Sequence, residues 1–98
     1  MATFTTHTLD TAPEGAIARL TDVQKAWGFL PKLHSKLAES PLALEAYDTL
    51  FGMVASRSSL TAIEQQVAYQ TVNVFHECEY CTAGHTYLSR MVKMDEGV

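Results

Sequence analysis

Apolar residues recur at three- and four-residue steps along most of the chain, which is the period of an α-helix. The first such stretch follows Pro13, and its apolar positions Leu20, Val23 and Trp27 fall on one helical face. Charged residues occupy the other face, and Gly28 ends the stretch. This pattern predicts an amphipathic helix over about residues 14–27.

Two further helices are predicted in the middle of the chain. One starts at Pro31, a residue suited to the first helical position, and runs to Glu39. The other starts at Ser40-Pro41, where a serine hydroxyl can cap the helix and a proline follows. Its broad apolar stripe consists of Ala43, Tyr47, Leu50, Phe51 and Val54.

The C-terminal part predicts two more helices. Thr61 and Glu64 match a capping box, in which each side chain accepts a backbone N–H of the other residue. The apolar face of that helix continues through Ile63, Val67, Thr71, Val74 and Phe75. A last helix begins between Glu77 and Tyr80 and continues to about Val92.

No segment alternates with a two-residue period between hairpin signals, so strands are not indicated. Residues 1–12 lack a helical period and are rich in threonine, and we expect an extended N-terminal arm there. The sequence therefore predicts an all-α bundle of about five helices, forming a single domain over residues 1–98. Its 98 residues leave room for one small core.

The amino-acid composition excludes several classes of protein. With 47% hydrophobic and 18% charged residues, the chain is too apolar for intrinsic disorder. Seven basic and eleven acidic residues give a net charge of −4, which disfavours nucleic acids and anionic membranes as partners. No apolar run approaches the roughly 20 residues of a membrane span, and the N-terminus lacks the pattern of a secretory signal. We therefore expect a cytoplasmic protein.

The candidate chemistry lies in Cys78-Glu79-Tyr80-Cys81-Thr82-Ala83-Gly84-His85. On a helix, Cys81 and His85 lie one turn apart, and Cys78 is a neighbour on the same face. Dithiol chemistry needs this arrangement, because two sulfurs must approach and a base must form the nucleophilic thiolate. Glutamates flank Cys78 and disfavour a thiolate there. We therefore expect Cys81 to be the more acidic thiol, His85 its proton partner and Cys78 the resolving cysteine, although a helix N-terminus near Cys78 acts in the opposite direction.

Three other interpretations of the pair remain open at this point. It could be a structural disulfide, although the three-residue step removes little loop entropy. It could be part of a zinc site with His85 and either His76 or Glu77, although no second ligand pair exists. It could be two small buried apolar side chains. Haem attachment of the c type is excluded because threonine, not histidine, follows the second cysteine, and a thioredoxin fold would need flanking strands.

The sequence resembles a known family. The segments 60–67 and 78–85 resemble the core of the alkylhydroperoxidase AhpD-like and carboxymuconolactone decarboxylase-like family, in its peroxidase-related branch. Gly28-Phe29-Leu30-Pro31 and the Ser40-Pro41 helix resemble the segment that precedes this core. The likeness covers about residues 16–95.

The resemblance implies an all-helical fold that assembles into trimers, hexamers or related oligomers. It assigns Cys78 and Cys81 to the redox pair and His85 to the distal histidine of a proton relay. Well-characterised members carry a glutamate at the position of Gln66 and a histidine at that of Tyr80. Peroxidase-related members also continue for several helices after the motif. The decarboxylase branch lacks the cysteine pair, which argues against the lactone reaction.

The function expected is therefore that of an oxidoreductase, a dithiol-dependent peroxidase or disulfide reductase in antioxidant defence. The resemblance implies a hydroperoxide or a partner peroxiredoxin as substrate and a lipoyl or thiol electron donor. The sequence predicts no cofactor and no metal ligands. The alternative is a non-catalytic helical oligomerisation module whose cysteine pair senses redox state.

Other residues are expected to be structural. His7 and His34 are predicted to be solvated, and Glu64 to cap its helix rather than replace the relay glutamate. The large aromatic residues are predicted to lie in the core or in an interface; they are Trp27, Phe29, Tyr47, Phe51 and Phe75.

Overall fold

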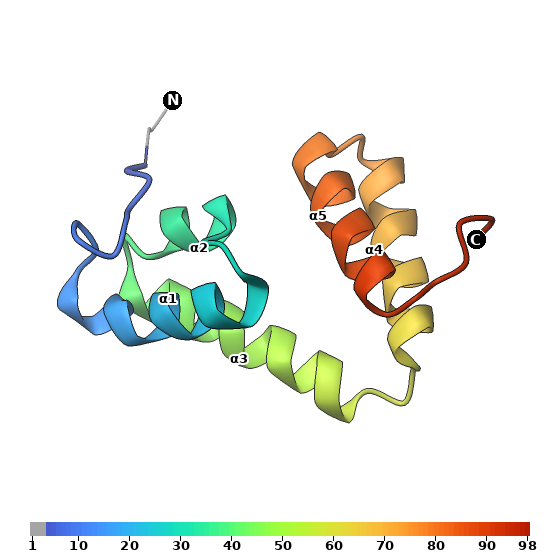
Figure 1. Ribbon diagram of the computed structural model, residues 1–98, viewed down its shortest axis with the longest axis horizontal. Helices are drawn as coiled ribbons and strands as arrows, with labels where there is room; N and C mark the ends of the chain where they lie inside the picture. Colours follow the sequence, from blue (N-terminus) through green and yellow to red (C-terminus); the bar gives the residue numbers. More distant parts are fainter. Residues whose placement is uncertain (1–3) are drawn as a thin grey trace. The chain divides into compact units, whose positions relative to one another are not determined.

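Five α-helices and no strand make up residues 4–98, the part of the chain that the computed structural model describes (Figure 1). The helices are α1 (Glu14–Trp27), α2 (Lys32–Leu37), α3 (Pro41–Arg57), α4 (Ala62–Phe75) and α5 (Glu79–Met91). The all-α prediction is confirmed. None of the helices described is long and apolar enough to cross a membrane.

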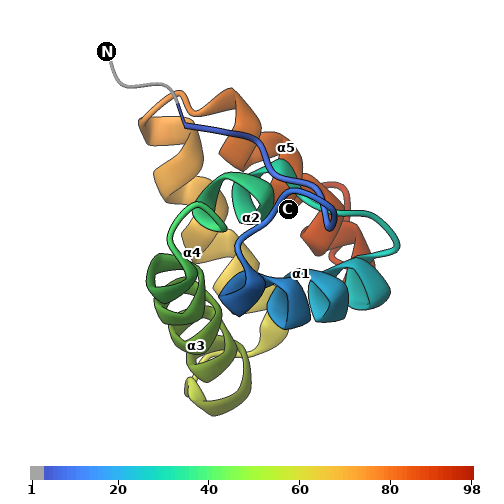
Figure 2. The same cartoon turned by 90° about the vertical axis from the view of Figure 1, so that its left-hand side faces the viewer.

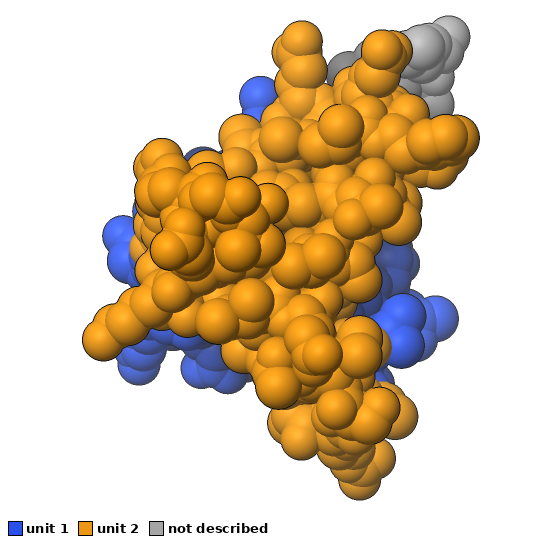
Figure 3. Space-filling view, turned by 90° about the vertical axis from the view of Figure 1, so that its right-hand side faces the viewer, with its two compact units in different colours: residues 1–52 blue, residues 53–98 orange. Residues whose placement is uncertain are grey.

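The chain divides into two compact units, residues 1–52 and residues 53–98 (Figure 3). We call them the N-terminal unit and the C-terminal unit, and the division between them falls within α3. The first holds α1 and α2, the second holds α4 and α5, and each is described by itself.

The N-terminal unit is built around a small apolar core. Gly28 ends α1 with a φ of 83°, a left-handed conformation that glycine adopts without steric cost. Pro31 is the N-cap of α2, so the helix begins one residue later than predicted. The fully buried core residues are Ala16, Leu20, Ala38 and Leu44, and partly buried leucines and an alanine pack against them.

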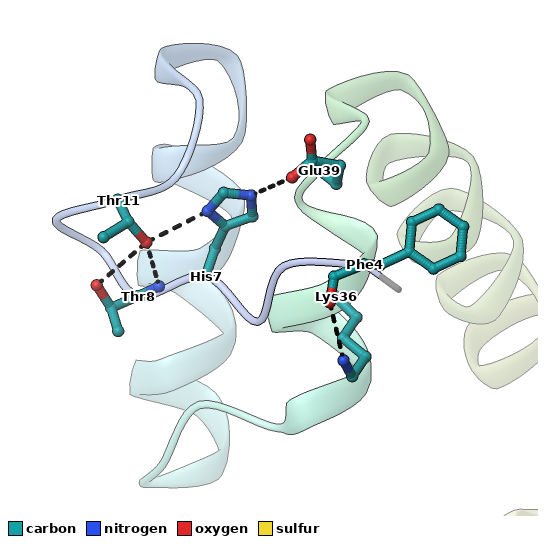
Figure 4. Close-up of polar contacts among 6 residues, drawn as sticks. All are labelled: Phe4, His7, Thr8, Thr11, Lys36 and Glu39. Atoms are coloured by element: carbon teal, nitrogen blue, oxygen red, sulfur yellow. Dashed lines mark hydrogen bonds and ion pairs between the residues drawn. The ribbon is translucent and has the colours of Figure 1, made fainter. Parts of the chain in front are cut away.

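The N-terminal arm is fastened to α2, which corrects the prediction that His7 is solvated (Figures 2 and 4). His7 is 9% exposed, and its Nε2 lies 2.5 Å from a carboxylate oxygen of Glu39. Its backbone N–H donates to the carbonyl of Ser35, and Lys36 Nζ donates to the carbonyl of Phe4. Residues 4–8 of the arm have no regular secondary structure, and residues 9–12 form turns. Residues 1–3 of the predicted arm lie outside the described residues.

His34 is also buried rather than solvated. It is 6% exposed, its Nε2 lies 3.4 Å from Asp48, and its ring meets that of Tyr47 edge to face. Its Nδ1 is buried without a hydrogen-bond partner among the described residues. Burial lowers the pKa of His34, and the nearby Asp48 carboxylate raises it in part. His34 is therefore held mainly as the neutral ring.

The C-terminal unit contains a hairpin of two helices that lie side by side, α4 and α5 (Figures 1 and 2). The capping box predicted for α4 is present: Glu64 N–H donates to the Thr61 hydroxyl at 3.2 Å, and Thr61 N–H donates to the Glu64 carboxylate at 2.8 Å. This confirms the capping role of Glu64. At the other end of the hairpin, α5 is capped by Cys78.

The contact between α4 and α5 is largely polar. The Gln70 amide donates to the Thr82 carbonyl and to the Thr86 hydroxyl, both at 3.2 Å. The Asn73 amide donates to the Cys81 carbonyl at 3.2 Å and to the Gln70 side-chain oxygen at 3.0 Å. Polar side chains of α4 therefore form the inner seam of the hairpin.

The apolar side chains of α4 point to solvent instead. Phe75 is 80% exposed and Val74 is 63% exposed, so Phe75 does not belong to a core of this chain. Ile63 and Val67, on the same predicted apolar face, are also exposed. Phe29 of the N-terminal unit is likewise exposed. The helical period identified the apolar residues of α4 that share a face, but in the structure this face is exposed.

Candidate redox site

Cys78 and Cys81 form a disulfide at the start of α5. Their Cα atoms are 5.3 Å apart, within the range that a disulfide requires, and both side chains are half-buried. The structure thus brings the two predicted site cysteines together. A disulfide is expected both for a redox pair in its oxidised state and for a structural bond. The residues around the pair are therefore needed to distinguish the two.

A sharp turn between α4 and α5 places the first cysteine. Glu77 has a φ of 53°, a conformation that non-glycine residues seldom adopt, and the backbone N–H of Cys78 donates to the Asn73 carbonyl at 3.0 Å. Cys78 then occupies the N-cap of α5, where its sulfur accepts the backbone N–H of Cys81 at 3.3 Å. The positive end of a helix stabilises negative charge, so this position supports a thiolate on Cys78 when the disulfide is reduced. The exposed glutamates Glu77 and Glu79 oppose this effect.

His85 lies one helical turn after Cys81 on α5, as predicted, and is half-buried. Its ring stacks on Tyr69 of α4, with ring centroids 4.4 Å apart and planes inclined by 25°. Its Nδ1 lies 2.8 Å from the side-chain oxygen of Gln66, also on α4. Burial lowers the pKa of His85, so the ring is neutral at physiological pH and has the protonation state of a base.

The hydrogen bond of His85 therefore goes to α4 and not to a sulfur. In the oxidised pair neither sulfur carries a proton, so no thiol is present for the ring to accept from. The second ring nitrogen, Nε2, is not the atom that contacts Gln66.

One family model matches more than half of the chain. The model of the carboxymuconolactone decarboxylase family matches residues 41–97. The chain belongs to this family. The matched range contains α3, α4 and α5 and with them the whole disulfide site. No curated protein and no solved structure matches the chain.

Within this family member, two site residues escaped prediction. Tyr69 stacks on His85, and Asn73 holds the first turn of α5 through the Cys81 carbonyl. A signal was present: polar or amphipathic residues recur at positions 66, 69, 70 and 73, which is a helical stripe inside an otherwise apolar segment. Such a stripe indicates that α4 uses this face for specific hydrogen bonds.

The structure does not support a zinc site at the cysteine pair. Among residues 4–98, no group of three or more histidine, cysteine or acidic side chains is arranged to hold a metal ion. His76 lies at the C-cap of α4, and its ring contacts that of Phe75.

An apolar pocket of about 360 Å³ lies beside the site, within the C-terminal unit. Its lining residues are Val54, Leu60, Gln65, Ala68, Tyr69, Val72 and Asn73. Tyr69 belongs both to this pocket and to the ring stack on His85.

Proposed function

We propose that this chain is a thiol-dependent oxidoreductase of the cytoplasm that reduces hydroperoxides or a partner peroxiredoxin. The observation that carries the proposal is a disulfide between Cys78 and Cys81 at the N-terminus of α5, with His85 one helical turn after the second cysteine. A purely structural bond would need neither the histidine nor the capping position.

In the reaction proposed, the reduced enzyme begins with a Cys81 thiolate, whose proton has passed to His85. The thiolate attacks an oxygen of the hydroperoxide, the O–O bond breaks, and the alkoxide leaves as an alcohol with the proton from His85. Cys81 is then a sulfenic acid, and the peroxide has received two electrons.

Cys78 completes the cycle. Its thiolate, supported by the N-terminus of α5, attacks the Cys81 sulfur and expels hydroxide, which leaves as water after taking a proton. The disulfide of the structure is the product of this step. An external lipoyl or other dithiol then reduces it by thiol–disulfide exchange and becomes a disulfide itself. No cofactor is needed for the proposed steps.

The pocket lined by Tyr69 supports a substrate with an apolar group. Its lining is mostly aliphatic, and it lies against the ring that stacks on His85. An alkyl group in the pocket would bring the attached peroxide toward the cysteine pair.

We also propose that the chain forms a homo-oligomer, a trimer or hexamer. The exposed apolar side chains of α4, including Val74 and Phe75, make a surface that a second copy can cover. Burial of this surface between copies would contribute about 25 cal/mol for each Å² removed from water.

The alternative is a non-catalytic oligomerisation module that senses redox state through the same cysteines. Gln66 favours it, because an amide contacts His85 where well-characterised relatives have an ionisable carboxylate. Such a module would be oxidised once by peroxide, whereas an enzyme turns over while a dithiol is supplied.

Steady-state peroxide consumption with dihydrolipoamide as donor tests the proposal. We expect the reduced chain to consume many equivalents of an alkyl hydroperoxide and Cys81→Ser to lose turnover. Cys78→Ser should lose intramolecular disulfide formation while Cys81 is still oxidised. Consumption that stops after one equivalent in the presence of donor establishes the sensor, and full activity of Cys81→Ser overturns the mechanism.

A further inference from the structure

Gln66 is a buried polar side chain aimed at the site histidine. It is 6% exposed, and its Oε1 lies 2.8 Å from Nδ1 of His85. Burial of an amide is unfavourable unless it is hydrogen-bonded, so this contact constrains both partners. The adjacent Gln65 is just as buried, but its amide donates to the Leu60 carbonyl of the chain preceding α4.

The chemistry of the contact decides which nitrogen of the ring holds the proton. An amide oxygen only accepts hydrogen bonds, so Nδ1 must donate, and in a neutral imidazole Nε2 then has the free lone pair. If the amide were turned over, its NH₂ would donate to Nδ1 and the ring proton would lie on Nε2. Only the first arrangement leaves Nε2 able to accept a thiol proton.

We propose that Gln66 is a positioning residue that holds His85 as the Nδ1–H tautomer, with Nε2 as the sole proton acceptor of the cysteine pair. This inference rests on the proposed function, and it specifies how the site operates without a carboxylate at this position. Tyr69 fixes the plane of the ring by stacking, and Gln66 fixes its rotation and tautomer.

Because the partner of His85 is a neutral amide, the route of the transferred proton differs from that of a site with a carboxylate. An amide cannot take up the proton that His85 receives, so the proton returns from Nε2 to the leaving group or to water. Gln66 and Tyr69 of α4 contact the ring, and neither is a carboxylate; on α5, Cys81 precedes His85 by one turn. At this position the ring therefore contacts an amide that cannot hold the proton, where a glutamate could.

Two leucine variants form a matched pair for the test. Gln66→Leu removes the acceptor from His85, and Gln65→Leu removes an equally buried amide from the same helix without touching the ring. Gln66→Glu restores a carboxylate, which favours the charged ring and raises the pKa of His85 by about one unit or more.

The experiment records ¹H–¹⁵N correlations of the His85 ring in the reduced, labelled 98-residue chain over pH 5–9. We expect the Nδ1–H tautomer in the parent and in Gln65→Leu, mixed tautomers in Gln66→Leu, and an upward shift of the titration midpoint in Gln66→Glu. Iodoacetamide alkylation of Cys81 in a Cys78→Ser background, followed against pH, should shift with Gln66→Glu and not with Gln65→Leu.

The parent spectrum alone can overturn the inference, since an Nε2–H tautomer there contradicts it even if every variant fails to fold. Indistinguishable tautomer populations in the two leucine variants would also contradict it. These spectra need no peroxide, so an Nδ1–H ring in a chain that consumes no hydroperoxide refutes the proposed function and leaves the role of Gln66 in place.

Discussion

The backbone N–H of Cys81 donates a hydrogen bond to the sulfur of Cys78, 3.3 Å away, so the first cysteine of the pair caps the helix that carries the second. The same atom thus has two functions. It closes the first turn of α5, and it is the atom that forms and breaks the disulfide. Changes at Cys78 should therefore affect the stability of the helix as well as its chemistry.

This dual function can be separated by two substitutions in the reduced protein. A serine hydroxyl is a good N-cap, whereas alanine has no acceptor, so we expect Cys78→Ala to be less stable than Cys78→Ser by about 1 kcal/mol. Urea unfolding in the presence of reductant measures the difference. Equal unfolding midpoints would show that the sulfur contributes nothing as a cap.

Asn73 should stabilise the hairpin through its amide. Asn73→Ala removes the hydrogen bonds to Cys81 and Gln70 and leaves a carbonyl of the α5 first turn without its side-chain donor. We expect a loss of about 1–2 kcal/mol and faster hydrogen exchange at the start of α5. The matched control is Thr71→Ala, since the Thr71 hydroxyl donates only to the Val67 carbonyl of its own helix; its effect should stay within about 0.5 kcal/mol. A similar loss in both variants would contradict the prediction.

The histidines His34 and His85 should make the protein less stable in mild acid. Burial lowers the pKa of His34 and of His85 below the ordinary value of 6.5. The unfolded chain then binds more protons than the folded chain below that value, so the stability present above pH 6.5 falls as the pH decreases through it. Each unit of difference in pKa is worth about 1.4 kcal/mol.

Urea midpoints between pH 5 and pH 8 measure this dependence. Replacing His34 by glutamine should flatten the curve, because that side chain does not titrate. Asp48→Asn should steepen it, since the carboxylate that partly offsets burial is then lost. Stability that rises on acidification from pH 7 to pH 5 would refute the assignment.

The exposed face of α4 should determine the association state. Val74→Glu places a charge among apolar side chains, and we expect it to shift the sedimentation coefficient from that of an oligomer toward that of the 10.8 kDa chain. Ser59→Glu, at an exposed position before α4, serves as the control for added charge. A parent that sediments as a monomer at micromolar concentration would contradict the proposed oligomer.

The sequence predicted best what is decided locally. The glycine that ends α1 and the Thr61–Glu64 capping box act over one helical turn, and both occur where the pattern placed them. The spacing of the cysteine pair and His85 is equally local, and the structure places Cys81 and His85 on α5 with Cys78 at its N-cap.

The rest depends on residues far apart in the chain. His7 is buried because Glu39, 32 positions later, binds it, and His34 because Asp48 and Tyr47 of another helix meet it. Helical periodicity also shows that a helix has a polar face without showing which face packs, and α4 places polar residues such as Gln66 and Asn73 against α5. The polar stripe at positions 66, 69, 70 and 73 shows that such a face exists, but the helix against which it packs is not part of the local sequence pattern.

The polar contact between α4 and α5 implies that the hairpin of these two helices is not stable by itself. Hydrogen bonds contribute only about 0.5–1.5 kcal/mol each when water can replace them, and the apolar side chains that could supply more face outward. An excised peptide of residues 62–91 should therefore be largely unstructured in water, with its two thiols as ordinary as those of a flexible chain. The reactivity of the cysteine pair is in this sense not encoded by its motif alone.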